Sequence, residues 1–276
     1  AKLLSFAQET DIGLVKGRGK GNAERRPSKW GASGGTKITS GDYTYHVFTA
    51  DTPSPQSSLV VTAVADSRSA QILVVGGGGE GGKDDGGGGG AGSVVYDPTF
   101  SLSGTNTYAV TVGATASTPS PPTSGGPFGA LGNNSSFGSN FLAKGGGSGA
   151  KSPIPPSNIG GSGGGGAYPG VEGAPGSAPG NIPPSATSYQ TAGGANGSPG
   201  AVEGGGGGGA GSAGGNGSPG PGLGGNGRAF PEFPAPIIAP AIPSPQQSAF
   251  TNAVGPTGLF GGGGGAGGRS PAKQGG

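Results

Sequence analysis

The stretch Ile72-Leu-Val-Val-Gly-Gly-Gly-Gly79 decides the fold, because an apolar run passes directly into pure glycine with no turn between them. Isoleucine and valine are branched at Cβ and favour extended strands. The reverse arrangement follows shortly afterwards, where Gly86–Gly90 and Ala91-Gly-Ser93 lead into Val94-Val-Tyr96. These two junctions predict β-strands whose ends continue as extended glycine segments.

Glycine is gathered into runs along the whole chain. The 276 residues include 71 glycines and 27 prolines, and proline- or aromatic-bearing segments separate the glycine runs. The main runs lie at 76–79, 86–90, 145–147, 163–166, 204–209 and 261–265. Without Cβ atoms, extended helices of the polyproline II type can approach closely enough for the backbone groups of neighbours to pair. The sequence therefore predicts a polyglycine II bundle, in which only the outer helices carry Ala, Ser, Asn or Pro.

The composition excludes several other classes. With 30% hydrophobic and 6% aromatic residues, the chain cannot fill one large apolar core. It has no cysteine for a disulfide or a thiolate metal site, and His46 is its single histidine. A flexible linker would be monotonous Gly and Ser. A collagen-like triple helix is the remaining rival, although the glycine phase that begins at Gly205 breaks at Leu223.

Residues 38–117 are expected to form a β-rich domain, similar to a small sandwich, that leads into the first glycine runs. Stretches typical of strands lie at 43–49, 58–65, 70–75, 94–96 and 107–112. The overall fold class is therefore mostly β plus irregular structure, with the polyglycine bundle following the β-domain.

Residues 1–37 form a basic zone, with 8 basic and 3 acidic residues. Such an arm suits docking on an acidic protein surface or on nucleic acid, and a solvated arm is the simpler alternative. We expect a protein partner and no nucleic acid. The residues expected to dock are Lys16, Arg18, Arg25, Arg26 and Trp30.

Residues 118–276 are expected to form the main glycine-rich bundle with loops that carry proline and aromatic residues. Aromatic side chains can stack on sugars or anchor a protein contact at low entropic cost. The alternative is that they cap the glycine bundle or bury a subunit contact. The candidates for an exposed tip or an interface are Tyr168, Tyr189, Phe230, Phe233, Ile237, Ile238 and Phe250.

Three motifs suggest chemistry, but their context is poor. Gly77 to Lys83 has the spacing of a phosphate-binding loop, yet Asp84 replaces the Ser or Thr and no helix can form over Gly86–Gly90. Glu80, Asp84 and Asp85 could bind Ca²⁺, but no Gly/Asp nonapeptide repeat supports it. His46 lies in a strand without a Ser–His–Asp context. We expect no enzymatic activity and no cofactor.

The order of these motifs resembles the glycine-rich domain of bacteriophage tail fibre and tail-tip proteins, of the kind found in marine and cyanobacterial phages. The resemblance covers residues 38–270, and proline-rich 231–240 departs from it. Its motifs are Tyr45-His-Val-Phe-Thr49, Ile72-Leu-Val-Val75, Val94-Val-Tyr96, Tyr108-Ala-Val-Thr-Val-Gly113 and Asn134-Ser-Ser-Phe-Gly138.

The resemblance implies a virion structural protein of the tail or fibre that attaches to the host surface through loops of the glycine-rich module. Its expected partners are other virion proteins, a host surface glycan or outer-membrane protein, and further copies of the same chain. The chain shows no signal peptide, so it is expected to be assembled into virions in the host cytoplasm. The alternatives are a structural, connector or decoration protein without a receptor, or an extracellular glycine-rich matrix or cell-wall protein.

Overall fold

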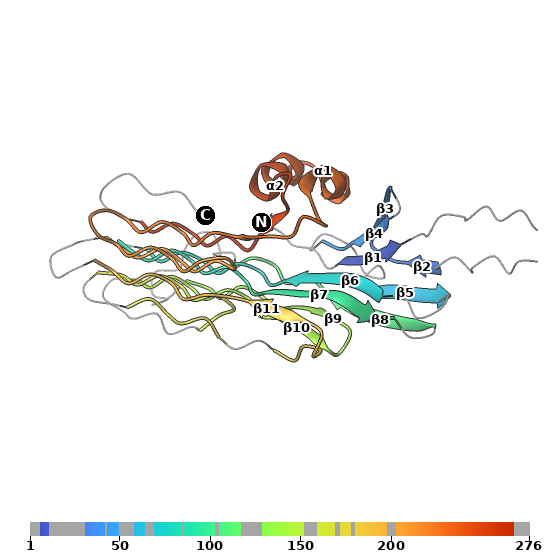
Figure 1. Ribbon diagram of the computed structural model, residues 1–276. Helices are drawn as coiled ribbons and strands as arrows, with labels where there is room; N and C mark the ends of the chain where they lie inside the picture. The colour runs from blue at the N-terminus through green and yellow to red at the C-terminus, as the bar shows by residue number, and fades with distance from the viewer. Residues whose placement is uncertain are drawn as a thin grey trace, which may run out of the picture.

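The structure is a computed structural model in which β-strands occupy one half of the molecule and glycine-rich segments extend from them to the opposite end (Figure 1). Helices lie on one side of the strand-bearing half. The structure describes residues 6–10, 31–41, 43–49, 58–63, 69–83, 85–102, 105–116, 129–151, 159–168, 172–177, 180–197 and 203–267.

A six-stranded sheet forms the centre of the strand-bearing half, in the order β11-β7-β6-β1-β4-β3. Every neighbouring pair in it is antiparallel. Strand β1 lies between β4 and β6 and joins the β3–β4 hairpin to the rest of the sheet. The strands are β1 (Phe6–Thr10), β3 (Thr36–Ser40), β4 (Tyr43–Val47), β6 (Ser69–Val75), β7 (Val94–Ser101) and β11 (Thr187–Tyr189).

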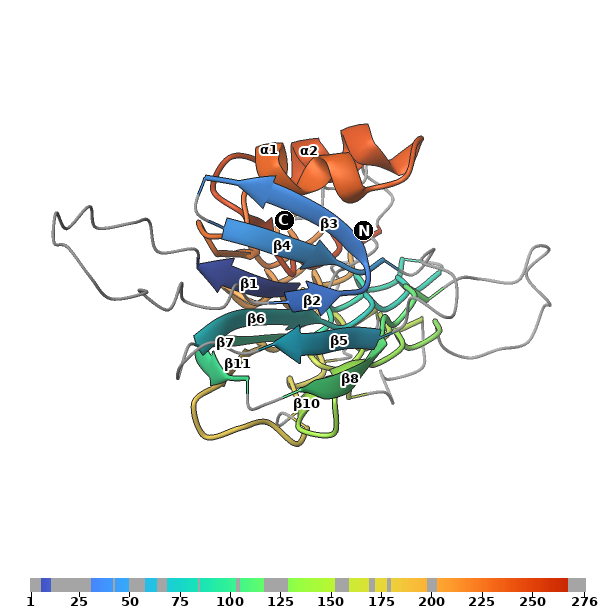
Figure 2. The same ribbon diagram turned by 90° about the vertical axis from the view of Figure 1, so that its right-hand side faces the viewer.

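A second sheet of five strands, in the order β10-β9-β8-β5-β2, packs against the first (Figure 2). Its strands are β2 (Gly31–Ser33), β5 (Ser58–Ala63), β8 (Asn106–Thr111), β9 (Ser135–Phe137) and β10 (Phe141–Ala143). A small separate ladder pairs β12 (Arg228–Ala229) with β13 (Leu259–Phe260).

Strand β6 shows how the layers form, because both of its faces are buried. Side chains alternate across a strand. Ile72 and Val74 join the apolar cluster between the two sheets, whereas Leu73 and Val75 join a second cluster on the other face. A near-continuous apolar run is what a strand buried on both faces requires.

The second cluster is covered by a layer of short helices (Figure 2). These are α1 (Ala235–Ile238), the 3₁₀ helix η1 (Ala239–Ala241) and α2 (Gln246–Val254). Pro236 lies near the start of α1, where its missing N–H costs no helical hydrogen bond. Gly255 follows α2 with φ 60°, a conformation that glycine adopts readily.

The remaining chain runs in segments outside any helix or named strand, which we call the glycine segments. They are 76–82, 86–93, 112–116, 129–134, 144–150, 159–167, 172–177, 190–196, 203–210, 212–217, 221–227 and 261–267. Segment 76–82 continues β6 away from the sheets, and 86–93 returns into β7.

The prediction of a mostly β protein is confirmed, and each predicted strand is present within a few residues of its expected bounds. The expected zone boundaries differ in detail from the fold. Part of the basic zone, at β1 and β2, belongs to the two sheets, and β9, β10 and β11 come from the third zone. The helical layer lies in residues 235–254, where the sequence indicated only proline- and aromatic-bearing loops.

Candidate functional site

Hydrogen bonds between glycine segments recur at every third residue. Along segment 76–82, the amides of Gly76, Gly79 and Gly82 donate to the carbonyls of Ser93, Gly90 and Gly87 in the antiparallel segment 86–93, at 2.8–3.0 Å. The residues one position further along the chain face another neighbour. The amides of Gly77 and Glu80 donate to the carbonyls of Asn133 and Ala130 in segment 129–134. Successive residues of one segment therefore point to different neighbouring segments.

Segment 203–210, which contains six consecutive glycines, lies at the centre of this network. Backbone hydrogen bonds connect it to six others, which are segments 86–93, 159–167, 190–196, 212–217, 221–227 and 261–267. The contact with 261–267 again follows a period of three, because the amides of Gly204, Gly207 and Ala210 donate to Gly267, Gly264 and Gly261. A segment surrounded on all sides has no face on which a side chain could stand.

The spacing of the segments explains why this run is pure glycine. A Cβ atom added at any residue of 204–209 would lie closer than 3.0 Å to the backbone of a neighbouring segment. Outer segments are less restricted. Segment 172–177 reads Glu-Gly-Ala-Pro-Gly-Ser and hydrogen bonds to segments 159–167 and 190–196. Pure glycine is therefore required in the central run 204–209, whereas segment 172–177 accommodates other residues.

The hydroxyl groups of buried serines form hydrogen bonds that connect the segments to one another near the sheets. Ser135 donates its hydroxyl to the Val75 carbonyl at 2.7 Å and accepts from the Gly113 amide at 2.9 Å. Ser162 donates its hydroxyl to the Gly209 carbonyl at 3.1 Å. Each hydroxyl thus satisfies backbone groups of segments that are far apart in sequence, and such buried groups are costly to leave unpaired.

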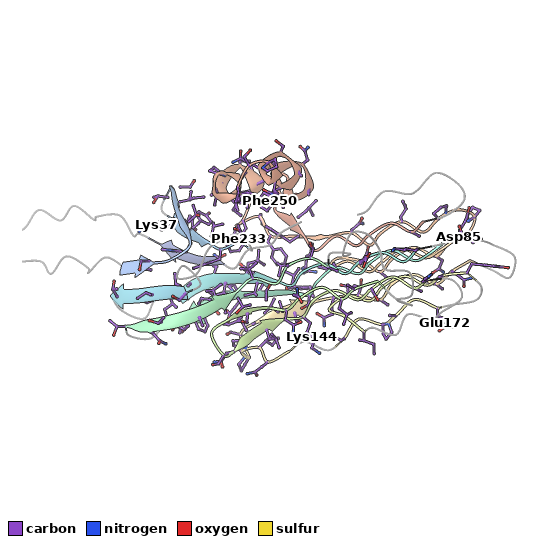
Figure 3. All side chains as sticks on the ribbon, turned by 180° about the vertical axis from the view of Figure 1, so that it is seen from behind. Lys37, Asp85, Lys144, Glu172, Phe233 and Phe250 are labelled. Carbon is purple, nitrogen blue, oxygen red and sulfur yellow. The ribbon has the colours of Figure 1, made fainter. Side chains whose placement is uncertain are left out.

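Most of the predicted tip residues lie in the core beside the sheet instead. Phe230, Phe233, Ile238 and Phe250 are buried in one cluster with Tyr45, Leu73 and other residues of the six-stranded sheet. Figure 3 shows Phe233 and Phe250 between the helices and the sheet. The expectation of an exposed tip is therefore wrong for Phe230 and Phe233, and Ile238 and Phe250 are likewise buried, because all four side chains hold the helical layer on the sheet.

Three further candidates are half-buried. Ile237 and Tyr189 pack against the same cluster. The Tyr189 ring also contacts Phe230 and carries the Arg228 guanidinium 4.0 Å above its centroid. Tyr168 directly follows segment 159–167, at the end remote from the sheets. A role of Tyr168 in binding stays a prediction.

The neighbouring Tyr96 was not predicted to matter but supports the same cluster. Its ring lies edge-on to Phe230 and Phe233, with centroids 5.2 and 6.2 Å away, and its hydroxyl donates to Gln71 Oε1 at 3.0 Å. Burial, assisted by the nearby Glu232 carboxylate, raises the pKa of Tyr96 to about 12. The hydroxyl therefore remains protonated and can donate throughout the physiological range.

The five predicted docking residues, Lys16, Arg18, Arg25, Arg26 and Trp30, lie outside the described residues. Their role therefore stays a prediction.

The phosphate-loop motif has no helix behind it in the structure, since Gly86–Gly90 belongs to a glycine segment. Within the described ranges, which leave out Asp84, no three His, Asp or Glu side chains gather in a way that could hold a metal. His46 is 1% exposed, and its Nδ1 lies 2.9 Å from the Gly34 carbonyl oxygen. That arrangement suits a histidine held within the fold, because the ring does not reach the surface.

The far end, by which we mean the ends of the glycine segments remote from the sheets, carries several charged residues. Figure 3 shows Asp85 and Glu172 there, with Lys37 at the opposite end. Lys83 and Glu172 are exposed, and Asp85 is half-buried. Glu80 is anchored, because its carboxylate accepts a hydrogen bond from the Ala130 amide at 2.9 Å. The far end thus offers polar groups on short connections between packed segments.

The chain matches the family described as glycine-rich domain over residues 52–276, and it belongs to that family. Strands β1 to β4 precede the matched region, yet β1, β3 and β4 complete the six-stranded sheet and β2 completes the five-stranded one. No curated protein and no solved structure matches the chain significantly. In the part of the chain that the structure describes, no helix has the length and apolar character to span a membrane.

Proposed function

We propose that the glycine segments are polyglycine II helices packed side by side. A threefold helix presents successive residues in three directions. The repeat of three in the hydrogen bonds of segments 76–82 and 203–210 supports this conformation. The six neighbours of segment 203–210 support close packing around a central helix. A six-residue run of such a helix rises roughly 19 Å.

We further propose that this bundle is a stiff support that presents its far end to a host cell, in a bacteriophage tail or fibre protein. The observation that carries the proposal is the backbone network itself. It joins the glycine segments to one another by backbone hydrogen bonds, whereas apolar clusters hold the other half of the molecule together on both faces of the six-stranded sheet. Loops on a rigid scaffold lose little entropy on binding and suit recognition.

The test is binding of the fluorescently labelled full chain to a panel of intact marine Gram-negative and cyanobacterial cells. The far-end variant combines Lys83→Ala, Tyr168→Ala and Glu172→Ala. The matched strand-end variant combines Lys37→Ala, Tyr43→Ala and Glu232→Ala. We expect the unaltered chain to bind at least one strain, and the far-end variant to bind about tenfold more weakly or worse.

The strand-end variant is expected to bind as the unaltered chain does. Binding lost with the strand-end variant and retained with the far-end variant would reject presentation at the far end. No binding to any strain of the panel would reject attachment and favour a structural virion component.

A further inference from the structure

A hollow with a volume of about 500 Å³ lies in the strand-bearing half, remote from the far end. It is formed by the end of β7, the start of β8 and the hairpin between β9 and β10. These three pieces come from both sheets of the sandwich, so the hollow opens where the apolar cluster between the sheets reaches the surface.

Aromatic rings form the floor of the hollow. Tyr108 stacks on Phe137 with the ring centroids 5.0 Å apart and the planes 12° from parallel. Phe100 lies edge-on to Tyr108 at 5.9 Å. Phe137 is buried, whereas Tyr108 and Phe100 are half-buried and line the hollow. A rigid, preformed apolar surface is therefore available to a ligand.

The rim consists of neutral polar side chains. Asn106 and Asn140 are both exposed there. The amide oxygen of Asn106 accepts from the Thr107 backbone amide at 2.8 Å, and that of Asn140 accepts from the Ser139 hydroxyl at 3.0 Å. These bonds orient the two side chains and leave their NH₂ groups as donors toward a ligand. All the described residues that line the hollow are uncharged.

We propose that this hollow binds a neutral sugar residue of a glycan. The C–H face of a pyranose ring is apolar and can pack on the aromatic floor, while its hydroxyl oxygens can accept hydrogen bonds from the two asparagine amides. A phosphate, a nucleotide or an acidic sugar would require Lys or Arg beside it. The site is separate from the far end and does not depend on the function proposed there.

The test uses the full chain and a panel of neutral sugars, namely oligomers of glucose, galactose, mannose and N-acetylglucosamine. Saturation-transfer NMR detects binding, and titration calorimetry measures affinity. The site variant combines Asn106→Ala and Asn140→Ala, both surface changes that leave the core intact. Asn133→Ala, at another exposed asparagine, is the matched control.

We expect at least one sugar to bind, and the site variant to weaken that binding by about tenfold, as for removal of ligand hydrogen bonds. The Asn133→Ala variant should match the unaltered chain. The proposal would be overturned if no neutral sugar of the panel gave a saturation-transfer signal. It would also be overturned if the site variant bound the sugar with unchanged affinity. Preference for sulfated or sialylated sugars would contradict the uncharged site. Sugar binding can be present even where cell attachment through the far end fails.

Discussion

His46 lies on β4 with its Nε2 buried and without a hydrogen-bond partner, while its Nδ1–H can donate to the Gly34 carbonyl. Burial lowers the pKa of the imidazole below its ordinary value of 6.5, and Lys37 acts in the same direction; the Gly34 bond opposes them. The folded protein therefore holds His46 neutral at pH 7.

This pKa shift predicts a stability change in mild acid. As pH falls below 6.5, the unfolded chain takes up a proton that the folded chain resists, so the free energy of unfolding should decrease. The loss should approach about 1.4 kcal/mol per pH unit between the two pKa values. Because the chain has no other histidine, chemical denaturation between pH 7.5 and about pH 5 isolates this residue from the carboxylates.

The control is His46→Asn, whose side-chain amide can replace Nδ1–H as donor to Gly34 but does not titrate. The free energy of unfolding of this variant should not change over the same pH range. An equal decline in His46→Asn and the unaltered chain would show that His46 is not the group responsible.

At the scale of an element, segment 76–82 tests whether close packing demands glycine. A Cβ at Gly79 would meet the backbone of Gly146 and Gly147 closer than 3.0 Å, whereas a Cβ at Gly78 would come no closer than 3.9 Å to its nearest neighbour, the Gly90 carbonyl oxygen. Gly79→Ala should therefore lower the free energy of unfolding by about 1–3 kcal/mol or more, because two segments must separate.

The neighbouring Gly78→Ala should cause no loss, and could gain up to about 1 kcal/mol by restricting the unfolded chain. Denaturant unfolding followed by circular dichroism measures both variants. Equal effects at the two positions would mean that the segments are not packed as the structure has them.

The elements differ in how well local sequence could predict them. β6 and its extended glycine continuation were predictable, because a run rich in β-branched residues favours a strand and the glycine run follows it with no turn residue between them. Strand β1 was not, since the short sequence Phe6–Thr10 gains its pairing from β4 and β6, which are distant in sequence. Helix α2 left a weak signal, as Gln246–Val254 contains neither glycine nor proline and Gly255 follows it.

The candidate site was harder to predict than the fold. Phe230, Phe233 and Phe250 lie among prolines and glycines, a context shared by exposed loops and by short segments folded onto a sheet. Only the packing of α1 and α2 on the six-stranded sheet decides between these two environments. The aromatic floor at Phe100, Tyr108 and Phe137 combines three strands, so no contiguous motif could indicate it.

At the scale of the whole molecule, two kinds of core support each other. Apolar clusters on both faces of the six-stranded sheet hold the strand-bearing half together. Backbone hydrogen bonds perform that role in the other half, where the packed segments are mostly glycine. Strands β6 and β7 connect the two halves, because they continue directly into segments 76–82 and 86–93.

Amide hydrogen exchange of the full chain, resolved by NMR, tests this account most directly. We expect the amides of Gly205, Gly206, Gly207 and Gly208 to exchange on the order of 10³-fold or more slowly than in an unstructured glycine peptide, alongside those of β6 and β7. Exchange of these glycine amides at coil rates, with β6 still protected, would contradict a core made of backbone hydrogen bonds.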